Sequence, residues 1–184
     1  MEEYINFKNG IEYNKIVEVA KIIRQGGIGI FPTETVYGIG ADCFNIDAVQ
    51  KIFEIKKRSK EKALSVLISN LSMVDELAQN ISEKERKIME KFFPGPITII
   101  LNKSSKVPNI VTAGKDTIGI RVPENKIALS LIEEVGRPLA TPSANISGKP
   151  SGIEYEQIIK DFKGKIDFFI DSGKSKIRLK FYYC

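Results

Sequence analysis

The sequence predicts a single α/β domain. Amphipathic helical patterns and short apolar strands interleave along the whole chain, which is the element order of this class, although not every strand pair need be parallel. The length of 184 residues suits one domain that buries roughly 70% of its unfolded surface. The 42% hydrophobic and 28% charged residues form a globular composition and exclude a disordered chain.

The helices are predicted from apolar periodicity and capping residues. In the first helix, apolar residues recur at positions i, i+3, i+4 and i+7 from Ile16, and Gly26 ends the pattern. Asp47 is expected to cap the second helix, and Ser82 with Glu85 has the Ser-x-x-Glu spacing of a capping box. The predicted helices span 12–25, 48–57, 72–79, 82–92, 125–135 and about 154–161.

The strands are predicted from short apolar runs between glycines and prolines. Ile28 begins the first strand directly after Gly27, and Pro123 ends a later one. The segment Pro94-Gly95-Pro96 separates a helix from the strand that follows it. The predicted strands span 28–31, 64–69, 97–101, 117–122, 138–141 and 166–170.

Missing residue types exclude several classes of catalytic site. The chain has no His, which excludes Ser-His-Asp triads, Cys-His nucleophiles and His-bearing zinc sites. Its two cysteines, Cys43 and Cys184, are too few for a zinc finger or an iron–sulfur site and are expected to be reduced thiols of a cytoplasmic protein. The acidic N-terminus is no secretory signal, and no apolar run approaches the roughly 20 residues that span a bilayer. The chemistry must therefore use carboxylates, hydroxyls, Lys, Arg, backbone amides or a metal carried by the substrate. We also expect no association with a membrane.

The positive charge is concentrated in two places. The formal net charge is +5, which suggests an anionic partner, but four cations and no acid follow Asp171, so the rest of the chain is nearly neutral. The second concentration is the segment 56–62, with five cations and one acid at the end of a predicted helix. These cations suit a polyphosphate, or they complement the helix dipole and are solvated.

Two polar loops follow predicted strands. The loop 32–40 carries Thr33, Glu34, Thr35 and Tyr37 beside glycines, as a loop that borders a ligand would. The loop 141–148 has the small polar residues of an anion-binding nest. Each is also ordinary turn chemistry. Neither a Walker A motif nor a Gly-x-Gly-x-x-Gly after a strand is present, which excludes a P-loop enzyme and an ordinary Rossmann protein.

Five segments in one order resemble a known family. They are Pro32–Gly38, Lys56-x-Arg58, Phe93–Thr98, Arg121–Pro123 and Pro142–Gly148, written PTETVYG, KxR, FPGPxT, RVP and PSANxSG. Together they resemble the YrdC-like family, the threonylcarbamoyl-AMP synthases, over about residues 12–173. The resemblance implies a twisted mixed parallel and antiparallel sheet with flanking helices and a concave ligand face. It also implies a reaction that joins L-threonine, bicarbonate and ATP into threonylcarbamoyl-AMP and pyrophosphate, for the t6A modification of tRNA by a downstream transferase.

The resemblance also implies roles for individual residues. It implies no covalent nucleophile, in keeping with phosphoryl-type chemistry that depends on positioning and charge neutralisation. Mg²⁺ would be carried by the phosphates, with few or no protein ligands. Ser59 and Ala63 stand where many relatives have proline, and Leu67 where some have His. The implied threonine contacts are Thr33, Thr35, Tyr37, Arg121 and Thr141. The implied ATP contacts are Lys56, Arg58, Lys60, Thr117, Ser143, Asn145 and Ser151.

Two other functions compete with this one. The same fold could bind double-stranded RNA or tRNA through phosphate contacts without catalysis, although a nearly neutral body disfavours strong non-specific binding and allows only a weak one. The fold could also be the carbamoyl-adenylate domain of a maturation enzyme. Such domains are embedded in much longer chains, which argues against that function.

The C-terminal residues depart from the family pattern. Relatives carry Gly-x-x-Ser-Thr-Ile/Val after the strand that ends at Asp171, whereas residues 178–184 form an aberrant tail, RLKFYYC, that we expect to make no helix, strand or cap. Removing one A from AAA TTC TAC TAT TGT, which encodes KFYYC, gives Asn-Ser-Thr-Ile and the start of Val. We therefore expect a chain truncated or frame-shifted after about residue 177, with impaired activity. A short family variant with a diverged tail is the alternative.

This expectation is tested on the coding DNA. A one-base insertion predicts that the neighbouring frame encodes Ser-Thr-Ile-Val at this point and stays open downstream. A neighbouring frame that is closed, or that encodes another sequence, would exclude the insertion and favour the diverged tail.

Overall fold

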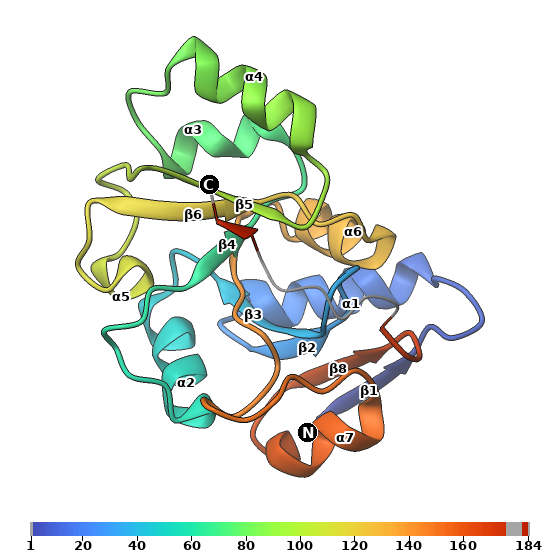
Figure 1. The fold of residues 1–184 in the computed structure, drawn as a ribbon. Helices are drawn as coiled ribbons and strands as arrows, with labels where there is room; N and C mark the ends of the chain where they lie inside the picture. Colours follow the sequence, from blue (N-terminus) through green and yellow to red (C-terminus); the bar gives the residue numbers. More distant parts are fainter. Residues whose placement is uncertain (1, 176–181, 184) are drawn as a thin grey trace.

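The computed structural model describes residues 2–175 and 182–183 and contains a nine-stranded mixed sheet in the order β1-β8-β2-β3-β7-β4-β6-β5-β9. Figure 1 shows the sheet twisting from β5 and β6 to β1 and β8. The pairs β1–β8, β2–β8, β4–β6 and β5–β9 are parallel, and β2–β3, β3–β7, β4–β7 and β5–β6 are antiparallel. The strands are β1 Glu3–Asn6, β2 Gly29–Phe31, β3 Gly38–Asp42, β4 Ser65–Leu67, β5 Ile97–Asn102, β6 Thr117–Arg121, β7 Leu139–Ala140, β8 Phe168–Asp171 and β9 Tyr182–Tyr183.

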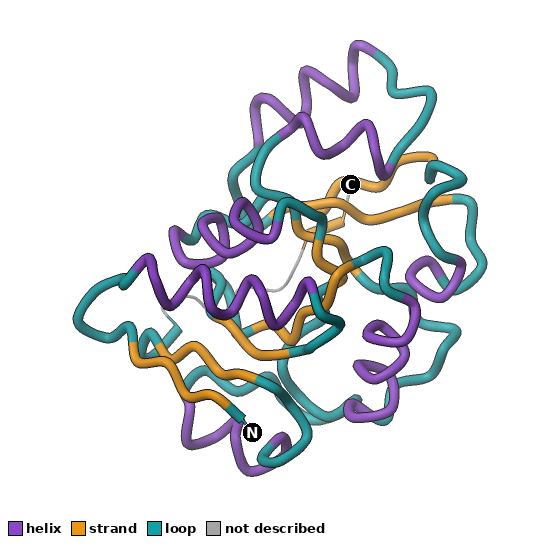
Figure 2. Tube along the Cα trace, turned by 180° about the vertical axis from the view of Figure 1, so that it is seen from behind, coloured by secondary structure: helices purple, strands orange, loops and turns teal. Residues whose placement is uncertain are grey.

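Helices flank both faces of the sheet. The helices α1 and α6 lie side by side (Figure 2) and pack on Phe31 and Phe168. The helices α2 and α7 pack on the neighbouring strand residues Ile30 and Phe169, which point to the opposite face because side chains alternate along a strand. The helices are α1 Tyr13–Arg24, α2 Ile46–Lys56, η1 Leu71–Met73, α3 Val74–Leu77, α4 Glu83–Phe92, α5 Asn109–Thr112, α6 Lys126–Val135 and α7 Tyr155–Phe162. The predicted mixed α/β sheet with flanking helices is confirmed.

Local capping explains where two of the helices begin. Ser82 accepts a hydrogen bond from the backbone N–H of Glu85, whose carboxylate accepts one from the backbone N–H of Ser82, so the predicted capping box is confirmed. The predicted Asp47 cap is wrong. Asn45 caps α2 instead, by accepting from the N–H of Ala48 at 3.0 Å, because the helix begins earlier than expected.

Several elements differ from the predicted ones. The strands β1 and β3 and the short helix α5 were not predicted, and the single predicted helix 72–79 consists of η1 followed by α3. Residues 182–183 form β9, so the expectation of no strand in the last residues is wrong. This pairing has a physical basis: the edge strand β5 offers unpaired backbone groups, and tyrosine favours extended structure.

The other expectations about the tail concern residues 176–181 and 184, among them Cys184, which lie outside the described residues. Cys43 is buried and forms no disulfide with any of the described residues. Within the described ranges, we find no helix with the length and apolar character needed to cross a membrane.

Candidate functional site

A cavity of about 140 Å³ lies on the face of the sheet that α1 and α6 cover. Leu67 of β4 lines this cavity and also belongs to the core cluster beneath those two helices. The remaining lining comes from the β2–β3 loop, from β5 and β6, from the segment after β7 and from the segment after α2. This volume has room for several waters and suits a small molecule. Six residues predicted as substrate contacts line it: Thr33, Tyr37, Arg58, Arg121, Thr141 and Ser143.

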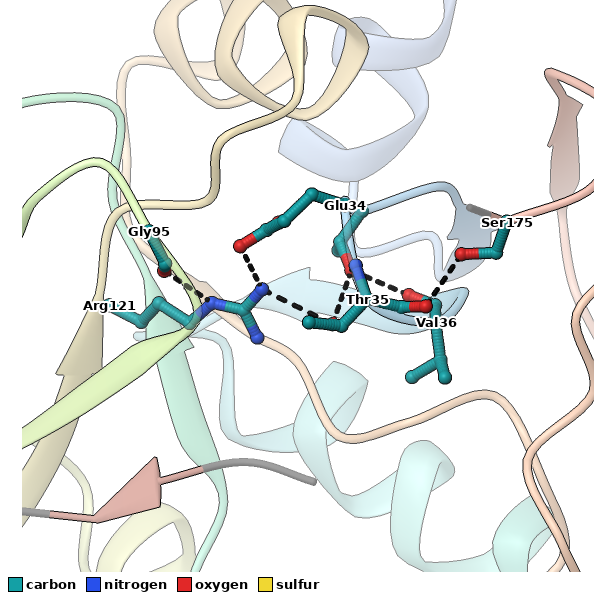
Figure 3. A network of polar contacts seen from close by, with 7 residues as sticks. Glu34, Thr35, Val36, Gly95, Arg121 and Ser175 are labelled. Carbon is teal, nitrogen blue, oxygen red and sulfur yellow. Dashed lines mark hydrogen bonds and ion pairs between the residues drawn. The ribbon is translucent and has the colours of Figure 1, made fainter. Parts of the chain in front are cut away.

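The Arg121 side chain is buried and held in one orientation. Only 2% of Arg121 is exposed, and its Nε donates to the carbonyl of Gly95 at 3.1 Å. Its Nη2 pairs with the Glu34 carboxylate and donates to Thr35 Oγ1 at 3.2 Å (Figure 3). A buried charge must be paired to be stable, and these contacts supply the pairing. The planar guanidinium therefore lies fixed at the cavity wall.

The β2–β3 loop is closed by its own threonines. Thr33 Oγ1 donates to the carbonyl of Val36 at 2.6 Å and accepts from the N–H of Thr35 at 3.2 Å. The two threonine hydroxyl oxygens lie 3.0 Å apart. Thr33 lines the cavity, whereas Thr35 contacts Arg121 from behind the lining. Of the predicted threonine contacts, Thr35 therefore holds the guanidinium, and Thr33, Tyr37 and Thr141 line the same cavity as Arg121.

The segment after β8 is bound to the same loop. The Tyr37 hydroxyl donates to the carbonyl of Gly173 at 2.6 Å and accepts from the N–H of Ser172 at 3.1 Å. Ser175 Oγ donates to the carbonyl of Thr35 at 2.6 Å (Figure 3). Burial raises the pKa of Tyr37, which keeps this hydroxyl a donor at neutral pH. The segment after β8 therefore stabilises the conformation of the β2–β3 loop.

The same segment is joined to the N-terminus of the chain. The buried Asp171 carboxylate accepts from Tyr4 Oη at 2.6 Å and from the backbone N–H of Gly173 at 2.8 Å. It also forms an ion pair with Lys8 Nζ at 2.9 Å. One carboxylate thus connects β1, β8 and the turn that Tyr37 contacts.

Lys56 lies beneath the loop that follows β7. The residue is fully buried, and its Nζ donates to the backbone carbonyls of Ser143 and Asn145. Burial, together with the neighbouring Arg58 charge, lowers the pKa of Lys56 to about 8. Lys56 therefore joins the end of α2 to the 142–148 loop and is absent from the cavity lining.

The remaining predicted ATP contacts divide into two groups. Arg58 and Ser143 line the cavity, and Arg58 Nη2 donates to the carbonyl of Ala63 at 2.8 Å. Ser143 Oγ donates to Asn145 Oδ1 at 2.5 Å, and Ser151 Oγ donates to the same oxygen at 3.4 Å, so these three side chains form one cluster.

Lys60 and Thr117 are not brought into this cluster. Lys60 Nζ donates to Gln50 Oε1 at 3.0 Å, on the exposed side of α2. Thr117 is exposed at the start of β6, four residues before Arg121, which is roughly 13 Å along a strand. Neither residue lines the cavity.

The structure adds residues that were not among the predicted substrate contacts. Glu34 pairs with Arg121, the carbonyl of Gly95 accepts from it, and Ser65, Leu67 and Thr98 line the cavity. An acid within a run of threonines was a signal for Glu34, and one threonine in the apolar strand 97–101 was a signal for Thr98. Over the part of the chain that the structure describes, no group of three or more Asp, Glu, Cys or His residues could hold a metal ion.

Comparison with known proteins gives consistent matches. A family model named Sua5_yciO_yrdC, described as "Telomere recombination", matches residues 21–180. The threonylcarbamoyl-AMP synthase of Pyrococcus abyssi is 44% identical over 173 residues, which is 94% of this chain and 51% of that protein. The synthase of Bacillus subtilis is 42% identical over 164 residues, which is 89% of this chain and 47% of that protein.

Solved structures agree with these matches. The P. abyssi Sua5 protein complexed with L-threonine superposes with a TM-score of 0.94 at 43% identity, covering 98% of this chain and 53% of that one. A double-alanine variant of the same protein gives a TM-score of 0.97 over 100% of this chain and 56% of that one. The chain thus spans about half the length of these relatives.

The pairing of Arg121 predicts a large effect of Glu34 on stability. Glu34→Ala removes the carboxylate that pairs with the buried guanidinium, so we expect the free energy of unfolding to fall by about 3–5 kcal/mol in urea denaturation. Asp75→Ala is the matched control, because the Asp75–Arg86 pair is exposed and should contribute less than about 1 kcal/mol. Equal losses in the two variants would contradict this account of Arg121.

Proposed function

We propose that this chain, which belongs to the Sua5/YciO/YrdC family, carries the site at which a threonylcarbamoyl-AMP synthase joins L-threonine, bicarbonate and ATP. The observation that carries the proposal is the buried Arg121 guanidinium at the wall of a cavity of amino-acid size. Residues 1–184 would form one YrdC-like domain of a protein whose relatives are about twice as long.

The amino acid would bind at Arg121. The planar fork of a guanidinium matches a carboxylate, and the contacts with Glu34 and Thr35 pre-orient it. Thr33, Tyr37 and Thr141 would enclose the rest of the amino acid. An apolar niche for one methyl group, worth roughly 1–3 kcal/mol, would favour threonine over serine.

ATP would approach from the side of Arg58 and Ser143. Arg58 and the buried Lys56 supply positive charge near the 142–148 loop, where Asn145 and Ser151 cluster with Ser143. A nucleotide is larger than the cavity, so part of it would extend beyond the lining, where Lys60 and Thr117 remain proposed contacts. The cations and hydroxyls of the lining suit phosphate oxygens rather than a metal ion, so we propose that Mg²⁺ enters bound to ATP.

The reaction would proceed by positioning the reactants. The amino group of threonine forms a C–N bond to the carbon of bicarbonate, a C–O bond of bicarbonate breaks and water is lost, which gives N-carboxy-threonine. Its carbamate oxygen then forms the new bond to the α-phosphorus of ATP. The bond from that phosphorus to the bridging oxygen of the β-phosphate breaks, and pyrophosphate leaves with the electron pair. The chain supplies orientation and positive charge and forms no covalent intermediate. A downstream t6A transferase in the cytoplasm would consume the product.

The proposal is tested by incubating the chain with L-threonine, labelled bicarbonate, ATP and Mg²⁺ and measuring pyrophosphate and threonylcarbamoyl-AMP. Arg58→Ala should weaken ATP binding about 10- to 150-fold, because each charge-assisted contact is worth roughly 1.5–3 kcal/mol, and should leave threonine binding unchanged. Lys84→Ala, on the exposed face of α4, removes the same charge and should have no effect.

The outcomes separate the possibilities. A parent chain that binds neither substrate would reject the proposed function. Normal ATP binding by Arg58→Ala would remove Arg58 from the nucleotide site. A parent chain that binds both substrates but forms little product would point to the altered C-terminal residues.

The pKa of Lys56 predicts a pH dependence of ATP binding. Lys56 is an ammonium below its pKa of about 8 and neutral above it, so its attraction for phosphate is present at pH 7 and lost by pH 9. ATP affinity, measured by calorimetry at constant ionic strength, should therefore fall as the pH rises through about 8. Lys56→Met should bind ATP weakly at pH 7 with no further loss to pH 9. An unchanged pH profile in this variant would exclude Lys56 as the cause.

A further inference from the structure

Thr98 carries a buried hydroxyl without a partner at the wall of the cavity. The residue has no exposed surface, and its Oγ1 makes no hydrogen bond within the described part of the chain. Thr98 also lines the cavity beside Arg121. A buried polar group without a hydrogen bond destabilises a fold, so its presence at a cavity wall calls for a function.

The register of β5 and β6 places Thr98 opposite Arg121. Ile99 pairs with Ile120 in an antiparallel ladder, so the preceding residue of β5 faces the following residue of β6. Opposed residues share one face of a sheet, with Cβ atoms about 4.5–5.5 Å apart. Thr98 and Arg121 therefore lie side by side at the same part of the cavity wall.

Gly119 fixes the orientation of Thr98. A Cβ atom on Gly119 would lie 3.0 Å from Cγ2 of Thr98, so the threonine methyl packs over the bare backbone of this glycine. A β-branched side chain has few χ1 rotamers, and once its methyl is placed the hydroxyl has a defined direction. Packing of the methyl against Gly119 thus restricts the orientation of the Thr98 hydroxyl.

Thr112 shows why the cavity matters to this argument. It is also a buried threonine whose hydroxyl has no partner among the described residues, but it lies on α5 and does not line the cavity. An unpartnered hydroxyl alone is therefore no evidence of a ligand site. Thr98, in contrast, combines an unpartnered hydroxyl with a place in the cavity lining and a position opposite Arg121.

We infer that the Thr98 hydroxyl donates a hydrogen bond to the amino-acid carboxylate that Arg121 binds, as a further binding residue of this site. A carboxylate only accepts hydrogen bonds, so a neutral donor and a guanidinium can share its two oxygens. The identity of the ligand as L-threonine rests on the proposed function. The contact would exist before and during the reaction, so its loss should raise the KM for threonine and leave kcat unchanged.

The inference is tested with three variants whose L-threonine affinity is measured by calorimetry. Thr98→Val keeps the shape and the methyl packing but removes the hydroxyl, and should bind about tenfold more weakly. Its melting temperature should not fall, because a buried unpartnered polar group is replaced by an apolar one. Thr98→Ser keeps the hydroxyl and should bind within about threefold of the parent. Thr112→Val is the matched control and should bind like the parent.

Three other outcomes would each contradict the role inferred for Thr98. Parent-like affinity in Thr98→Val would overturn the inference while leaving the proposed function intact. A loss of both stability and affinity in Thr98→Val that Thr98→Ser does not rescue would assign Thr98 to packing and also overturn it. A parent chain that does not bind L-threonine would reject the proposed function, and the inference with it.

Discussion

A guanidinium held out of water is the constraint around which this molecule is organised. Arg121 ends an interior strand of the sheet, and its charge would be costly to bury without partners. The partners come from places distant in sequence, namely the β2–β3 loop and the turn before β5. Pairing this one charge therefore draws two loops together and leaves a cavity between them. The buried ammonium of Lys56 acts in the same way on the 142–148 loop, whose carbonyls it holds.

The elements that the sequence predicted well are those whose signals are local. The periodicity of α1 and α6 and the capping box of α4 depend on residues within one or two turns. The strand β3 has no such signal, because Gly38 and Gly40 disfavour a strand. Gly38 is required by a distant contact: a Cβ there would lie 2.5 Å from Cγ2 of Thr141. The pairing of β9 likewise depends on an edge that only the assembled sheet creates.

Part of the cavity lining was predictable from the sequence, but its arrangement was not. The family resemblance implied roles for Thr33, Arg58, Arg121, Thr141 and Ser143, which the structure gathers around one cavity. The sequence could not separate Lys56, two positions from Arg58, as a buried residue beneath a loop. It also could not pair Glu34 with Arg121, since the two are 87 residues apart and only the fold brings them together. Burial and pairing are properties of the folded chain, whereas a motif records only residue type and spacing.

The Asp171 carboxylate has a practical consequence for handling the protein. It links Tyr4 and Lys8 to the turn at Gly173. The carbonyl of Gly173 then accepts a hydrogen bond from Tyr37, which lines the cavity. Residues 3–8 are therefore connected to the wall of the candidate site, although none of them lines the cavity. An affinity tag or a proteolytic cut in this segment is expected to disturb the cavity wall. Ligand affinities should therefore be compared only between preparations with the same N-terminus.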